Sequence, residues 1–229
     1  LQTLKRYNAL PVISFDSQLS NGYLYIQEAV KGGLIDIVRE YFSNPNSDPE
    51  CKTNKSLFAS EKSLAYLAAE NGQVEVLKVI LQNNGSIENG YRKRHVIYAA
   101  IEQGSLECTD YILSKYDLDA NLIIDEEENL RSADLACRCG NKSIIKMLYE
   151  RGAKLAQENQ NGLLPVYYAI EAEAYDIIPF FLEEKNEFNI HGQIIRYITR
   201  LGKVEAFSKL KAKFKDIVKS LENEDGENL

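Results

Sequence analysis

Two cysteines separated by one residue, Cys137 and Cys139, are the residues of this chain best suited to chemistry. Cysteine thiolates bind zinc or act as nucleophiles, but a zinc site needs further ligands and a nucleophile needs a nearby base. The repeat pattern described below places both cysteines on or just after a helix, where residues two apart point in different directions. No second Cys or His pair stands at a useful spacing. We therefore expect both side chains to pack structurally, with Cys139 the more exposed and more reactive thiol.

The chain has two histidines, His95 and His191, and a cysteine nucleophile would need one of them as its base. They fall about three repeats apart, which at about 10 Å per repeat separates them by about 30 Å. We therefore expect no catalytic residues. An enzyme built on Cys139 is the alternative, and it requires a histidine within hydrogen-bonding reach.

Four consecutive acidic residues, Asp125 to Glu128, have the composition of a calcium site but not its spacing. Consecutive side chains cannot converge on one ion, and the glycine-punctuated pattern of a calcium loop is missing. We interpret the run as a solvated loop tip. The sequence also has no Gly-rich phosphate loop, no Gly-x-Ser-x-Gly elbow and no His-Glu-x-x-His helix. We expect no metal and no cofactor.

The composition favours a folded protein that does not bind nucleic acid. The 229 residues are 45% hydrophobic and 27% charged, with a net charge of −7. Nucleic-acid affinity rests on Lys and Arg neutralising phosphates, so an acidic chain is a poor candidate for it. Four scattered cysteines indicate a reducing compartment, and no signal peptide or membrane span is predicted. We expect a cytoplasmic monomer; because the chain begins at Leu1, we also expect it to be a piece of a longer or processed protein.

The elements that position these residues emerge when the chain is superposed on itself. Residues 63–86 superpose on 24–42, 95–113, 131–153 and 164–184, and more weakly on 193–211. The copies share an anchor position with intervals of 39, 32, 36, 33 and 29 residues, so the period is about 34. A small residue, alanine, stands four positions before the anchor in five copies, and Ile198 occupies this position in the sixth. The anchors are Gly33, Gly72, Gly104, Gly140, Glu173 and Gly202.

Each copy is predicted to be a pair of helices joined at the anchor, where glycine most easily adopts a tight or left-handed backbone. The second helix has a broad apolar face at helical spacing, as in Val76, Leu77, Ile80 and Leu81. One pair cannot bury that face, whereas stacked pairs can, and the small residue lets neighbouring first helices approach closely. Polar stretches at 82–90, 125–129 and 156–162 are predicted to be projecting loops.

The period and the segment LAAENGQVEVLKVILQNNGS resemble the ankyrin-repeat family over residues 20–212. Gly162 and Pro165 match the family's loop glycine and helix-opening proline, but the Thr-Pro-Leu-His tetrapeptide is otherwise lost. The resemblance implies an all-α solenoid of about six helix–turn–helix units with projecting loops. We expect residues 1–19 to be a linker or cap. We also expect a C-terminal capping helix over 203–223. Residues 213–229 then contain the end of this helix and a disordered acidic tail.

The resemblance implies that a partner protein binds the concave face and the loop tips. Tyr91, Arg92 and Arg94 are the leading candidates because Tyr and Arg are enriched at binding hot spots. An alternative for Arg92 or Arg94 is an ion pair with the acidic tip of the next repeat. The full set of expected partner-binding residues is Tyr91, Arg92, Arg94, Glu102, Gln103, Glu127, Glu128, Arg138, Gln160 and Asn161.

The sequence thus predicts a protein-interaction module without an active site. The composition and the irregular repeats also resemble ankyrin proteins that intracellular bacteria deliver into host cells, which implies a host protein as partner and the host cytosol as location. The alternative function is the targeting or substrate-recognition region of a larger enzyme whose catalytic domain lies outside this chain.

Overall fold

The structure is a computed structural model, and it describes residues 20–50, 62–88, 90–182, 190–206 and 208. The expected linker at 1–19 and the expected tail at 213–229 lie outside these residues, as does most of the expected capping helix. The elements are α1 (Ser20–Lys31), α2 (Ile35–Ser43), α3 (Leu64–Glu70), α4 (Val74–Gln82), α5 (Val96–Gln103), α6 (Leu106–Tyr116), β1 (Ile123–Asp125), β2 (Leu130–Arg131), α7 (Ser132–Arg138), α8 (Lys142–Glu150), α9 (Pro165–Glu171), the 3-10 helix η2 (Tyr175–Ile177), α10 (Ile178–Phe181) and α11 (His191–Arg200).

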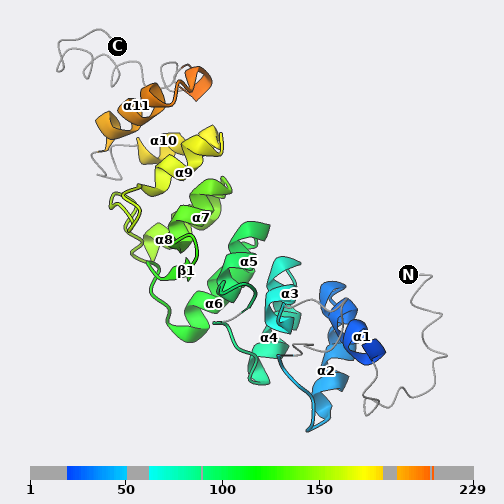
Figure 1. The fold of residues 1–229 in the computed structure, drawn as a ribbon. Coiled ribbons are helices and arrows are strands. Elements are labelled where there is room, and N and C mark those ends of the chain that lie inside the picture. Colours follow the sequence, from blue (N-terminus) through cyan, green and yellow to red (C-terminus); the bar gives the residue numbers. More distant parts are fainter. Residues whose placement is uncertain (1–19, 51–61, 89, 183–189, 207, 209–229) are drawn as a thin grey trace, which may run out of the picture.

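The helices form pairs that follow one another along a curved row from α1 to α11 (Figure 1). The first helices of the pairs (α1, α3, α5, α7, α9 and α11) line the inner side of the curve, and the second helices (α2, α4, α6, α8 and α10) lie outside them. Each first helix packs on the first helix of the next unit, and each second helix from α2 to α8 packs likewise on its neighbour. The all-α repeat solenoid predicted from the sequence is confirmed.

Each unit turns at its anchor through a left-handed residue. The φ angles at the six anchors lie between 61° and 77°, at Glu173 and Gly104 respectively. The residue after each anchor donates its backbone N–H to the carbonyl of the residue four positions before the anchor, at 2.9 to 3.2 Å. This bond caps the first helix and reverses the chain into the second. The sixth copy, the weakest in sequence, makes the same turn at Gly202.

The small residues before the anchors are buried between neighbouring first helices. Ala68, Ala100, Ala136 and Ala169 have no exposed surface. With only a methyl group at these positions, the first helices can pack closely, and the larger apolar side chains of the second helices fill the space beside them. The core is therefore continuous from Ile26 to Ala206.

Side-chain amides just after two anchors connect neighbouring units. The Asn141 amide donates to the carbonyl of Ile101 at 2.8 Å, and the Gln73 amide donates to the carbonyl of Lys31 at 3.3 Å. Both acceptors belong to the last turn of the preceding first helix, where carbonyls have no partner within the helix. The amides therefore satisfy helix ends that close stacking would otherwise leave without partners.

Two features depart from regular helix pairs. β1 and β2 form a short antiparallel hairpin in which Ile123 pairs with Arg131 and Asp125 with Leu130. In the fifth unit the second helix is reduced to η2 and the four-residue α10, which contains Pro179. Within the described residues, no helix is both long enough and apolar enough to cross a membrane.

Because Glu173 has a left-handed backbone, we expect glycine to be more stabilising than alanine at this position. Within a helix the order is the reverse. An L residue at such φ costs about 1–2 kcal/mol, whereas glycine adopts it freely. Because Glu173→Gly and Glu173→Ala both remove the ion pair to Lys203, their difference isolates the backbone. We expect the glycine variant to be more stable by about 1 kcal/mol in chemical denaturation.

A matched control is Lys146, which lies on an exposed turn of α8. There the order should be normal, with Lys146→Ala more stable than Lys146→Gly by about 1 kcal/mol. If alanine were also the more stable substitution at Glu173, the left-handed turn in the fifth unit would be wrong.

Candidate functional site

The loop tips of neighbouring units are joined by backbone hydrogen bonds. The N–H of Ser63 donates to the carbonyl of Gly90, and the N–H of His95 donates to the carbonyl of Ile124, both at 2.9 Å. Arg94 and Asp125 also form an isolated antiparallel bridge. The tips at 90–94 and 125–130 therefore form one connected surface along the first helices.

Arg94 belongs to the structure of these tips. Its Nε donates to the Asp125 carboxylate at 2.8 Å and its guanidinium lies 3.5 Å from Glu128. The guanidinium carbon also lies 4.3 Å from the ring centroid of Tyr98. The alternative considered from the sequence, an ion pair between Arg94 and the next acidic tip, is what the structure contains.

Glu128 joins two arginines from different elements. One carboxylate oxygen faces Arg94, and the other accepts a bond from Arg138 of α7 at 2.5 Å. Arg138 also donates to the Tyr98 hydroxyl at 3.0 Å. Burial, followed by the charge of Glu102, raises the pKa of Tyr98, so this hydroxyl stays neutral. We name this network of Arg94, Tyr98, Asp125, Glu128 and Arg138 the charged clamp.

The acidic run was expected to be a solvated tip, and for Asp125 this is wrong. Its side chain is fully buried, whereas Glu126, Glu127 and Glu128 are exposed. One Asp125 oxygen accepts the backbone N–H groups of Glu127 and Glu128 at 3.0 and 3.1 Å, and the other accepts from Arg94. Asp125 therefore organises the turn, because its four lone-pair sites satisfy donors that would otherwise lack partners.

Tyr91 to Arg94 form a two-residue turn. The N–H of Arg94 donates to the carbonyl of Tyr91 at 2.9 Å, and the central residues Arg92 and Lys93 have φ angles of 48° and 57°. Positive φ at both central residues defines a type I′ turn, which strongly favours Asn-Gly. The side chains of Arg92 and Lys93 are exposed, and neither forms an ion pair with the described residues.

The remaining predicted site residues divide into two groups. Asn161 donates its side-chain amide to the backbone carbonyl of Glu128 at 2.9 Å, so it links the loop at 156–162 to the tip at 125–130. The other four are exposed, and their side chains form no hydrogen bond or ion pair with the described part of the chain. They are Glu102, Gln103, Glu127 and Gln160.

A buried ionic network was not predicted from the sequence. Asp134 is fully buried and pairs with Arg131 through two oxygens at 3.0 Å. Arg131 also donates to the carbonyl of Gln157, and Asn159 donates both to Asp134 and to Tyr168. The available signal was Asp134 at the position where the repeat pattern has histidine. The network connects the fourth unit to the loop of the fifth.

Among the described residues, no histidine forms a hydrogen bond with a cysteine. Cys137 is buried, which raises the pKa of its thiol well above the usual value. Cys139 is exposed, as expected, but burial of its sulfur and then the charge of Glu102 raise its pKa too, so the thiolate is disfavoured. His95 is buried at the start of α5, where its Nδ1 accepts the Ile97 N–H at 3.4 Å. The described residues contain no group of three or more His, Cys, Asp or Glu placed to hold a metal.

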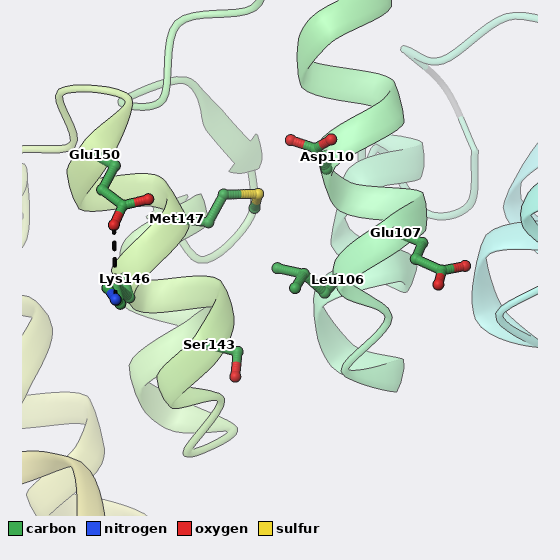
Figure 2. Close-up of a pocket in the computed structure, with 7 residues that line it drawn as sticks. All are labelled: Leu106, Glu107, Asp110, Ser143, Lys146, Met147 and Glu150. Carbon is green, nitrogen blue, oxygen red and sulfur yellow. Dashed lines mark ion pairs between the residues drawn. The ribbon is translucent and has the colours of Figure 1, made fainter.

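A groove of about 440 Å³ lies on the outer side of the solenoid between α6 and α8. Figure 2 shows Leu106 and Met147 facing each other across it, with acidic residues and Lys146 around them. Ser143 is the lone hydroxyl among its seven lining residues, which include no histidine or cysteine. No hydrogen bond joins Ser143 to the carboxylates of Glu107, Asp110 or Glu150 within the described residues, so the groove shows no paired nucleophile and base.

Among known protein families, a model described as ankyrin repeats matches residues 26–124 of the chain in three copies. This region spans α1 to α6 and reaches β1. A search of curated proteins found no match to the chain.

Arg94 and Arg92 are expected to differ sharply in their effect on stability. Arg94→Ala leaves the Asp125 carboxylate buried without its cation, so we expect the free energy of unfolding to fall by about 2–4 kcal/mol. Arg92→Ala, two residues away and exposed, should change it by less than about 0.5 kcal/mol. Urea denaturation of both variants measures the difference, and equal effects would contradict the charged clamp.

Burial lowers the pKa of His95 to about 4, which predicts a pH effect on stability. In the unfolded chain a histidine titrates near 6.5, so between pH 6.5 and 4 the unfolded state binds a proton that the folded state does not. The contribution of His95 to stability is therefore complete above about pH 6.5 and falls as the pH drops to 4, by about 3 kcal/mol.

The matched variant is His95→Asn, because asparagine also caps helix starts but does not titrate. Stability measured from pH 7 to 4 should fall less steeply in this variant than in the unmodified chain. Parallel pH profiles would show that His95 is not buried as a neutral group.

Proposed function

Because residues 26–124 of this chain are ankyrin repeats, we propose that it is a protein-binding module whose partner docks on the inner face and loop tips of the solenoid. Ankyrin repeats are generally protein-interaction modules and are typically not catalytic. The observation that carries the proposal is the set of exposed polar side chains on this surface that the fold does not use: Arg92, Lys93, Glu102, Gln103, Glu127 and Gln160.

The surface beneath these side chains is well suited to hold them in place. The charged clamp fixes the tip at 125–130 against α5 and α7, and Asn161 extends the connection to the loop at 156–162. A surface that is already ordered loses less conformational entropy when a partner binds. The groove between α6 and α8 lies on the opposite, outer side.

The partner is a protein whose surface complements alternating charges along the inner face. Glu102 at the end of α5 and Glu127 on the tip at 125–130 are exposed acidic residues, and Arg92 and Lys93 on the tip at 90–94 are exposed basic residues. The composition suggests a host-cell protein as the partner, and a capture experiment would then recover such a protein. A substrate would be captured in the same way if the chain is the recognition part of a larger enzyme.

The test is quantitative affinity capture with charge-reversed surfaces. We expect Glu102→Arg/Glu127→Arg to reduce the recovery of specifically captured proteins at least fivefold, measured by mass spectrometry. The control is Glu40→Arg/Glu107→Arg, which makes the same change of charge on the exposed outer helices α2 and α6. Circular dichroism establishes that both variants are folded. If the control loses the same proteins to the same extent, the inner face is not the binding surface.

A further inference from the structure

We propose that the tip around Tyr91 is a cationic–aromatic subsite that binds an acidic segment of the partner. The subsite, here named the basic tip, consists of Tyr91, Arg92 and Lys93. This inference rests on the proposed protein-binding function and specifies the chemistry of what is bound.

The backbone of the basic tip carries a conformation that its residue types do not favour. Arg92 and Lys93 both have positive φ in a type I′ turn, where Asn-Gly would be free of strain. Neither side chain forms an ion pair within the described structure, although the Arg92 guanidinium lies over the Tyr91 ring. Elsewhere, the strained anchor residue Glu173 does pair, with Lys203. Strain at exposed residues without such compensation is characteristic of functional sites.

Tyr91 gathers cations on its ring. The Arg92 guanidinium carbon lies 5.0 Å from the ring centroid. The Lys62 ammonium lies 5.2 Å from it and is itself paired with Glu70, so it packs on the ring as part of the scaffold. Tyr66 packs behind Tyr91, with ring centroids 5.8 Å apart. A guanidinium held against an aromatic ring keeps its N–H groups available at its edge, which is the geometry that binds carboxylates. Lys93 adds a second exposed ammonium beside it.

The surroundings favour a short acidic peptide segment over a nucleic acid. Glu88, Glu102, Glu126 and Glu127 are exposed in the adjoining loops and the end of α5. These carboxylates would repel a continuous polyanion that extends beyond the tip, and nucleic-acid binding depends on many phosphate contacts. A few carboxylates that reach only the basic tip avoid that repulsion, because exposed charges farther than about 8–10 Å are screened at physiological salt.

The experiment uses the full chain and a hexaglutamate peptide as the probe, with the backbone amides followed by NMR at physiological salt. We expect the peptide to shift the amides of residues 91–94, and hexaglutamine to leave them unchanged. In Arg92→Asn/Lys93→Gly the dissociation constant should rise at least fivefold. Because Asn-Gly suits the turn, the melting temperature of this variant should equal or exceed that of the unmodified chain.

The matched control is Lys142→Gln/Lys146→Gln, which removes two positive charges from the exposed side of α8. It should bind hexaglutamate with an affinity within twofold of the unmodified chain. Equal loss in both variants would reduce the effect to net charge and overturn the proposal. Tighter binding of a single-stranded RNA hexamer than of hexaglutamate at the same amides would also overturn it.

The result of the hexaglutamate experiment can be distinguished from the result of the capture experiment that tests the proposed function. If hexaglutamate fails to bind while Glu102→Arg/Glu127→Arg still loses its captured proteins, the basic tip is wrong and the protein-binding function stands. If hexaglutamate binds at the tip but capture is insensitive to the inner face, the subsite stands and the larger surface is wrong.

Discussion

Everything in this structure depends on a left-handed turn that recurs at six anchors. A helix pair exposes an apolar face that it cannot bury by itself, so the pair is stable only when its neighbours stack on it in register. The turn provides that register because it closes the first helix with a hydrogen bond to the same relative carbonyl in every unit. Even where the anchor is Glu173 instead of glycine, the backbone keeps the conformation.

Regular stacking brings residues far apart in sequence close enough to interact. The charged clamp joins Arg94, Glu128 and Arg138, which come from a loop tip, the next tip and a helix. The buried pair of Arg131 and Asp134 does the same for the following loop. These networks join neighbouring loops to each other and to the first helices by ion pairs and hydrogen bonds.

The candidate surface shows how the same residue types acquire different roles. Arg92 and Arg94 are separated by one residue, yet Arg94 is held by Asp125 whereas Arg92 extends outward against Tyr91. Their places in the turn explain the difference: Arg92 is one of its two central left-handed residues, whereas Arg94 follows the turn and bridges to Asp125 of the next unit. An inward arginine becomes part of the scaffold, and an outward one is available to a partner.

The sequence by itself determined the helix pairs, their period and the anchors, because apolar spacing and small residues at fixed offsets are local signals that survive without coordinates. It also placed Cys137 and Cys139 correctly at the end of a helix. Only the tertiary structure decided that Asp125 is buried, that Arg94 belongs to the scaffold and that Lys62 packs on the ring of Tyr91. The physical reason is that these roles depend on which charges face each other across neighbouring units. That pairing is set by stacking distance and turn geometry, and a residue's own neighbours in the sequence encode neither of these.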